Sequence, residues 1–214
     1  MSMKRQVLST TLILGLFGLA GAGLVATVEW LTRDAREASI VAARLKNLHI
    51  VIPPQIHDND ILADRIVIDD PAFSPRFKTI VYRARKNGRP VAAAFETTAP
   101  EGYAGPIRLL IGVDIDGRLT GVRVLEHRET PGLGDGIEAD RSDWIFGFTG
   151  KSIGNPPLSR WAVKKDGGDF DQFTGATITP RLVVNTVKKT LLYFDTHKDY
   201  VFSAEQPDHG ERDS

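Results

Sequence analysis

Two threonines in the C-terminal part of the chain, Thr174 and Thr177, lie on either side of two small residues. Gly175 and Ala176 keep side-chain bulk away, so the two hydroxyls and several backbone amides can converge in this short segment. A helix is expected directly after it, and the positive end of a helix favours a bound anion, especially a phosphate. A plain threonine-rich capping turn is the alternative interpretation.

The helix expected after this segment covers residues 180–197. Thr179 is a favoured N-cap residue, and Pro180 suits the first helical position because its φ is preset and it has no amide to leave unpaired. Apolar residues recur on one helical stripe, at Val183, Val187, Leu191 and Phe194. We therefore expect this helix to pack one face on a sheet.

Short β-like runs occupy the middle of the chain, at residues 65–68, 78–83, 90–95, 107–113 and 119–125. Two dipeptides typical of tight hairpin turns, Asn87-Gly88 and Asp116-Gly117, separate some of these runs. The pattern predicts an antiparallel sheet. Helical stretches at 137–148 and 180–197 would cover one face, which gives an α+β fold.

The N-terminal segment from residue 6 to residue 28 is uncharged and strongly apolar, and one helix of about 20 residues spans a bilayer core. Lys4 and Arg5 precede it and Trp30 follows, which favours a cytoplasmic N-terminus and an exported main domain. Four cations just beyond the span oppose this orientation, namely Arg33, Arg36, Arg44 and Lys46. A cleaved signal peptide is the alternative, although its apolar region would be only ~7–15 residues long.

The chain is expected to have four segments. Residues 1–32 would form the cytoplasmic N-terminus and transmembrane helix, 33–50 a membrane-proximal helix, 51–204 the main domain and 205–214 a polar tail. A stripe of small residues in the span would either pack against another helix or face lipid, and it consists of Gly18, Ala22 and Ala26.

Composition excludes several classes of function. The 214 residues include 27 Lys+Arg and 27 Asp+Glu, and this balance argues against a dedicated nucleic-acid binder. The chain has no cysteine, so disulfides, thiolate metal sites and iron–sulfur clusters are excluded, and any redox chemistry must use a borrowed cofactor. The five histidines show no ligand spacing, and no metal site is predicted.

The run Thr174-Gly175-Ala176-Thr177, with Asp171 ahead of it, resembles the flavinylation motif of the FMN-binding domain family. This family includes the G subunit of the Rnf electron-transport complex and the C subunit of the sodium-pumping NADH:quinone reductase. In the family, the last threonine of the motif carries FMN through a phosphoester bond, which a flavin transferase installs from FAD. The resemblance implies that Thr177 is the attachment residue and that the other motif residues surround the cofactor.

A second segment is similar to another signature of the family, and it reads Glu129-Thr130-Pro131-Gly132-Leu133-Gly134. Its glycines would let the backbone approach the isoalloxazine ring, since glycine has no side chain to block it. The glutamate and threonine would supply polar contacts, and the leucine an apolar one. An ordinary Pro-Gly turn is the alternative. A weaker similarity covers residues 102–107.

Lys165 is a further candidate flavin contact, with Lys164 beside it. A cation near the flavin would favour the reduced anion and raise the reduction potential, whereas a solvated hairpin edge is the ordinary role for lysine here. Trp144 could stack on the ring, but core packing is the more usual role of a tryptophan.

The resemblance implies a single-pass inner-membrane protein whose periplasmic domain relays electrons through covalent FMN. It would act with other subunits in a complex that couples electron flow to cation movement, with no independent catalysis, after maturation by a flavin transferase. Chain length favours the Rnf type, because the quinone-reductase member of the family is typically longer. A membrane-anchored binding or assembly module without covalent flavin is the competing hypothesis.

Overall fold

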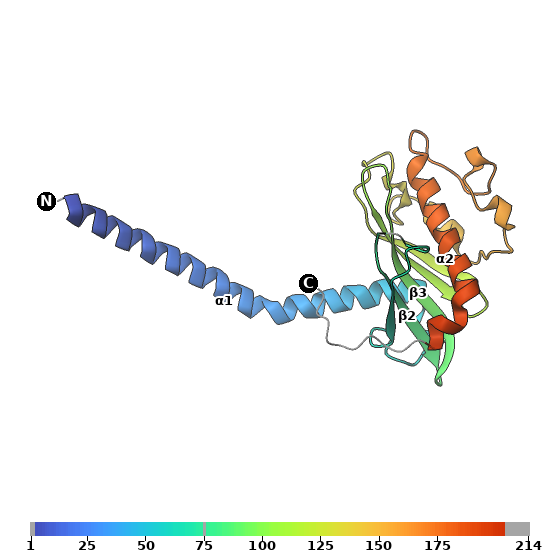
Figure 1. Ribbon diagram of the computed structural model, residues 1–214, viewed down its shortest axis with the longest axis horizontal. Helices are drawn as coiled ribbons and strands as arrows, with labels where there is room; N and C mark the ends of the chain where they lie inside the picture. Colours follow the sequence, from blue (N-terminus) through green and yellow to red (C-terminus); the bar gives the residue numbers. More distant parts are fainter. Residues whose placement is uncertain (1–2, 75, 204–214) are drawn as a thin grey trace. The chain divides into compact units, whose positions relative to one another are not determined.

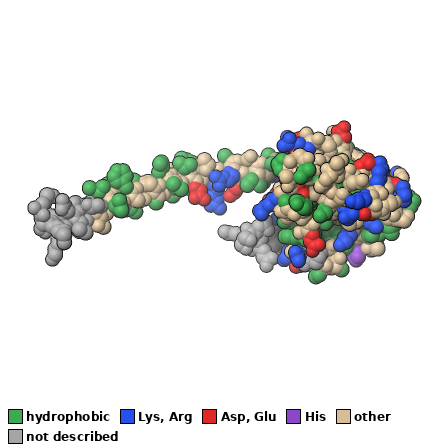
Figure 2. Space-filling view, turned by 90° about the horizontal axis from the view of Figure 1, so that it is seen from above, with side chains coloured by type: hydrophobic (Ala, Val, Ile, Leu, Met, Phe, Trp, Pro, Cys, Tyr) green, Lys and Arg blue, Asp and Glu red, His purple; other side chains and the backbone are tan. Residues whose placement is uncertain are grey.

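The computed structural model describes residues 3–74 and 76–203, and the polar tail expected at 205–214 lies outside this part (Figure 1). The chain divides into two compact units, with the boundary between Leu45 and Lys46. Most of helix α1 (Met3–Val51) forms the first unit. Within it, residues 11–33 are long and apolar enough to cross a membrane, with mean hydropathy 2.1. Hydrophobic side chains cover this stretch (Figure 2).

The transmembrane and membrane-proximal helices that we expected as separate segments form one continuous helix. The sequence explains the continuity, because no glycine or proline occurs between Gly23 and Pro53. The helix ends at Val51, two residues before the Pro53-Pro54 pair, and the short helix η1 (Pro54–Ile56) follows.

The second unit is built on a five-stranded antiparallel sheet, which confirms the α+β prediction. Its strands follow chain order across the sheet: β1 (Arg65–Ile68), β2 (Thr79–Lys86), β3 (Arg89–Ala99), β4 (Ile107–Asp114) and β5 (Leu119–Glu126). Asn87 and Gly88, with φ of 51° and 75°, form the β2–β3 turn, and Gly117 at φ 79° lies in the β4–β5 turn. Both predicted hairpins are therefore confirmed, and their short turns fix the register of the sheet.

Helix α2 (Ile178–Ser203) covers one face of the sheet (Figure 1), and it is kinked at His197, where the predicted helix ended. Its apolar stripe is buried as expected, together with inward-facing residues of the strands. Sheet side chains alternate between faces. The buried residues of α2 and of the face it covers include Val183, Val187, Leu191, Phe194, Phe95 and Ile111.

The helical stretch predicted at residues 137–148 is confirmed only in part, because it is not one continuous helix. Two short helices take its place, η2 (Asp135–Ile137) and η3 (Asp143–Phe148). Ser142 separates them: its backbone is extended, its hydroxyl accepts a hydrogen bond from the Trp144 N–H and donates one to the Gly136 carbonyl. Such local side-chain bonds to the backbone compete with a continuous helix. Two further short helices follow, η4 (Leu158–Arg160) and η5 (Lys164–Asp166).

The last turn of α1 packs on the sheet at a pair of glycines, Gly112 on β4 and Gly121 on β5, which are partners across the two strands. A Cβ atom at Gly112 would lie 2.7 Å from the carbonyl oxygen of Val51, 3.0 Å from its Cβ and closer still to the hydroxyl oxygen of Thr120. Leu48 and Val51 are buried here. A side chain at residue 112 would therefore have to displace this turn, the Thr120 side chain or both.

We expect Gly112→Ala to lower the free energy of unfolding of the main domain by about 1–3 kcal/mol, as overpacking of a filled interior does. Gly121→Ala is the matched control, because its Cβ would be 3.5 Å from the nearest atoms of Val51, an ordinary contact distance. Denaturant titration of the full chain in detergent measures both variants. Equal losses in the two would contradict this account of the packing.

A buried ion-pair network holds the C-terminal end of α2. Asp64 accepts from both Arg83 and Arg85, with nitrogen–oxygen distances of 2.5 and 2.8 Å. The two arginines also donate to the carbonyls of Val201 and Phe202, at 3.4 and 2.8 Å. Guanidinium groups at a helix C-terminus satisfy carbonyls that have no helical partner and complement the helix dipole. The network therefore fixes one end of α2 on β2.

Candidate functional site

Three segments far apart in the sequence meet at the N-terminal end of α2 and enclose a pocket of about 140 Å³. They are the loop before β4, the loop after β5 and the turn that precedes the helix. The lining residues are Tyr103, Glu129, Thr130, Leu133, Gly134, Gly175, Ala176, Thr177, Ile178 and Thr179. The pocket thus brings the two predicted motifs together.

Four of the predicted site residues do not line this pocket: Gly132, Thr174, Asp171 and Lys165. Gly132 has a positive φ of 78° and its N–H donates to Asp135, so it shapes the turn of its loop. Thr174 is exposed. The Asp171 carboxylate lies 2.6 Å from the amine of Lys164.

The start of α2 differs from the prediction. The helix begins at Ile178, and the carbonyl of Thr177 accepts from the N–H of Arg181 at 3.2 Å, so Thr177 takes the capping position that we expected for Thr179. The Thr179 hydroxyl instead donates to Glu129. Because first-turn N–H groups have no helical partners, donors and the positive end of the helix dipole lie beside Thr177.

Glu129 lines the pocket and is 5% exposed. One carboxylate oxygen accepts from the Ala104 N–H at 3.1 Å, and the other from the Thr179 hydroxyl at 2.5 Å. Its backbone N–H donates to Nδ1 of His127, whose Nε2 lies 2.6 Å from a carboxylate oxygen of Glu138. The side chain of Glu129 therefore binds donors from two other segments of the site.

Exposed apolar side chains form the rim of the pocket. Tyr103 is 71% exposed, Ile178 48% and Leu133 47%. Sequence reasoning named Leu133 but missed Tyr103 and Ile178 as site residues. Tyr103 lies within the weaker similarity at 102–107, which could have indicated it as a site residue. Its exposure could not be predicted from the sequence. A small pocket with mixed polar and apolar lining at the positive end of a helix suits a ligand that combines an anionic group with a flat aromatic ring.

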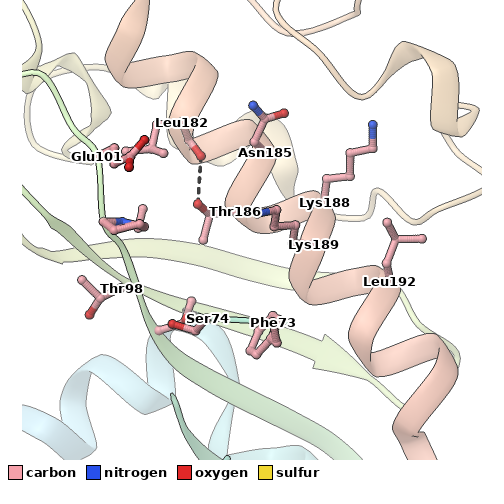
Figure 3. Close-up of a pocket in the computed structure, with 13 residues that line it drawn as sticks. Phe73, Ser74, Thr98, Glu101, Leu182, Asn185, Thr186, Lys188, Lys189 and Leu192 are labelled. Atoms are coloured by element: carbon pink, nitrogen blue, oxygen red, sulfur yellow. Dashed lines mark hydrogen bonds between the residues drawn. The ribbon is translucent and has the colours of Figure 1, made fainter. Parts of the chain in front are cut away.

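A second, larger pocket of about 450 Å³ lies between α2 and the end of β3 (Figure 3). Phe73, Leu182 and Leu192 contribute apolar surface, and Lys188 and Lys189 belong to its lining. The Thr186 hydroxyl in this pocket donates to the Leu182 carbonyl within the helix. None of the predicted site residues lines it, so volume alone does not identify the functional site.

Similarity to known proteins identifies the family of this chain. The chain is 50% identical over 192 residues to the G subunit of the ion-translocating oxidoreductase complex of Photorhabdus laumondii, with 90% of this chain and 92% of the relative covered. It is 45% identical over 208 residues to the protein of the same name from Pseudomonas aeruginosa, covering 95% of both chains. The chain belongs to the family of G subunits of ion-translocating oxidoreductase complexes. The resemblance to the Rnf member of the FMN-binding family is thereby confirmed.

Two family profiles match different parts of this Rnf-type chain. The RnfG N-terminal region matches residues 1–51, which are α1 and the residues before it. The FMN-binding domain matches residues 102–192. Every segment that lines the 140 Å³ pocket lies within the second match. The matched region therefore contains the whole candidate site.

Charged side chains near the start of α2 are largely paired with one another. Arg181 makes two bonds to the Asp166 carboxylate, at 2.6 and 2.8 Å. This hydrogen bonding lowers the pKa of Asp166 and raises the pKa of Arg181 from their ordinary values. Within the described residues, the Lys165 amine forms no ion pair. Its positive charge nevertheless contributes to lowering the pKa of Asp166. Lys165 is thus the cation of this stretch that remains available to a ligand.

Trp144 has a structural role. Its ring packs edge-on against Phe148 and Phe173, at centroid distances of 5.2 and 5.4 Å. Its indole N–H donates to the carbonyl of Asp171 at 2.8 Å. The side chain therefore joins the core to the segment that leads into the threonine motif, and it does not line the pocket.

Proposed function

We propose that this chain carries FMN in phosphoester linkage on Thr177 and relays electrons through it within a cation-translocating complex of the Rnf type. The observation that carries the proposal is the position of Thr177: it caps α2, lines the pocket and lies next to residues of both motifs. FMN supplies one- and two-electron redox chemistry when bound. The protein's own residues bind and orient the cofactor.

The residues present fit this cofactor. The Thr177 hydroxyl would form the ester, and the first-turn N–H groups of α2 would stabilise the single charge that the esterified phosphate keeps. The exposed side chains of Tyr103, Leu133 and Ile178 would contact the flat ring, which prefers apolar and aromatic surface. Because Arg181 is paired with Asp166, the N–H groups at the start of α2, and not the Arg181 side chain, would bind the phosphate.

The size of the pocket supports an electron-relay role. Its volume of about 140 Å³ is below the ~300–1,000 Å³ typical of sites that bury a small molecule. Only part of a flavin would enter it, and the rest would lie against the rim. A cofactor held at the surface suits electron exchange with a partner protein, whereas a cofactor that reacts with a small substrate is usually enclosed.

We further propose that residues 11–33 anchor the chain in the inner membrane, with the main domain on the periplasmic side. The apolar composition of this part of α1 and the two cations before it support the assignment. A covalent link has a clear purpose in that compartment. A flavin that dissociated outside the cytoplasm would have no pool from which to rebind, so an ester keeps it in place.

The direct test is mass spectrometry of the intact chain after co-expression with a flavin transferase and denaturation. We expect an added mass equal to FMN less water, and peptide mapping should place it on the peptide that contains Thr177. A chain that stays unmodified under these conditions would favour a membrane-anchored binding or assembly module without covalent flavin.

Lys165 offers a test of cofactor tuning. We expect Lys165→Gln to retain the flavin and to lower its reduction potential, because removing a nearby cation disfavours the reduced anion. Lys164→Gln is the matched control, since the Lys164 amine is already paired with Asp171. Spectroscopic redox titration of both flavinylated variants measures the effect. If both lysine variants show the parent potential, Lys165 does not contact the flavin.

A further inference from the structure

The Glu129 carboxylate connects the loop before β4 to the first turn of α2. Its two oxygens bind the Ala104 N–H and the Thr179 hydroxyl, which belong to segments on either side of it in the fold. Thr179 is 1% exposed and lies in the turn that begins directly after Thr177. The bond from Thr179 to Glu129 therefore determines how the start of the helix is held.

Two glycines leave the space that this carboxylate occupies. A Cβ at Gly134 would lie 2.7 Å from one carboxylate oxygen of Glu129, and a Cβ at Gly102 would lie 2.8 Å from the other. Gly134 has an ordinary backbone conformation, with φ −95°, so no turn geometry requires glycine there. Its role is to admit Glu129 and Thr179, whose hydroxyl oxygen would be 3.1 Å from that Cβ.

Within the described residues, no cation forms an ion pair with Glu129. A buried carboxylate without a cation depends on hydrogen-bond donors, and bonds of this kind are stronger than those between neutral groups. The positive end of α2 adds to this stabilisation. Because both oxygens already accept bonds from the protein, Glu129 is better suited to hold the site together than to bind a ligand directly.

We propose that Glu129 and Thr179 are a positioning pair that holds Thr177 in the geometry needed for flavin transfer. This inference rests on the proposed function. In the transfer, the Thr177 oxygen bonds to the FMN-side phosphorus of FAD and the pyrophosphate P–O bond breaks. AMP leaves with the bridging oxygen, and the hydroxyl proton is released to solvent. Neither member of the pair bonds to the reacting atoms.

The pair acts through the first turn of α2. Without the Thr179 hydroxyl, that turn loses its bond to the carboxylate, and Ile178 and Thr177, which precede Thr179 directly, are held less firmly. The transferase would still recognise the exposed residues Thr174 and Gly175, but the Thr177 hydroxyl would occupy the reactive position for less of the time. The turnover rate of transfer should therefore fall while the KM for the chain stays the same.

The test uses the full chain in detergent, purified flavin transferase and FAD, with initial rates of flavin incorporation measured against chain concentration. Thr179→Val removes the hydroxyl at nearly constant volume, and we expect kcat to fall about tenfold, the size expected for a bond to a charged group. Thr179→Ser keeps the hydroxyl and should transfer at the parent rate. Thr190→Val is the matched control: Thr190 is also buried on α2, and in the described part of the chain its hydroxyl bonds only to the Thr186 carbonyl.

Unfolding midpoints of all variants separate a loss of fold from a loss of positioning. A Thr179→Val variant that transfers as fast as Thr190→Val overturns the inference, and so does one that raises KM without lowering kcat. Peptide mapping of the parent chain distinguishes a failure of the positioning role from a failure of the proposed flavin attachment at Thr177. Flavin on Thr177 with a normal rate in Thr179→Val overturns the positioning role alone, whereas a parent chain without flavin on Thr177 overturns both.

Discussion

Thr177→Val should leave the chain folded and remove the covalent flavin completely. A methyl group replaces the hydroxyl at nearly constant volume, so the ester cannot form while packing around the half-buried side chain is retained. The free energy of unfolding should fall by no more than about 1 kcal/mol, the usual loss when a threonine at a helix N-cap is replaced. Mass spectrometry of the denatured variant and fluorescence of the flavin in a denaturing gel both measure attachment.

Thr174→Val is the control for this substitution within the same motif. Thr174 is exposed and does not line the pocket, so we expect its loss to weaken modification without abolishing it. Flavin that remained attached in the Thr177→Val chain would exclude Thr177 as the acceptor. Equal and complete loss in both variants would show that the motif is needed for recognition, and would leave the acceptor unassigned.

Asp64→Asn should destabilise the main domain by about 3–5 kcal/mol, the cost of breaking a buried ion pair from one side. The substitution keeps the shape of the side chain but leaves Arg83, whose side chain is 4% exposed, without the charge that it contacts at 2.5 Å. Arg85 loses its carboxylate partner as well. Since both arginines bind carbonyls at the end of α2, that end should become less protected in hydrogen exchange.

Asp169→Asn is the matched control for the buried pair. Asp169 lies 2.6 Å from Arg160, but the two side chains are 35% and 51% exposed. Exposed pairs contribute little, so this variant should lose less than about 1 kcal/mol. Denaturant titrations of the two variants give the comparison directly, and a similar loss in both would mean that burial of the Asp64 network is not what makes it stabilising.

The sheet was predictable because its signals are local. Alternating apolar residues and glycine-containing two-residue turns lie within a few residues of the strands that they define, and all five predicted runs coincide with observed strands. The prediction of a continuous helix at 137–148 failed because the apolar spacing there is helical, whereas the hydrogen bonds of the Ser142 hydroxyl interrupt the helix. Side-chain capping inside a periodic run is hard to detect from the spacing alone.

The site was predictable in part. The two motifs were identified from their residues, and the structure places them around one pocket. The partner of Thr179 could not be predicted, because Glu129 is 50 residues away in the sequence and meets it only in the folded domain. The same contact explains why the helix starts earlier than expected: the buried carboxylate binds the hydroxyl that would otherwise have capped the helix.

The order of the strands has a consequence for biogenesis. Each strand pairs only with strands next to it in the chain, so the sheet closes through short loops and can form progressively from β1 to β5. The contact between residues 179 and 129 needs α2 to be docked on the sheet, because it joins residues 50 apart in the chain. The pocket at the start of α2 therefore requires both the sheet and the docked helix. On the proposed assignment of Thr177, flavin attachment would then require a domain in which α2 has docked.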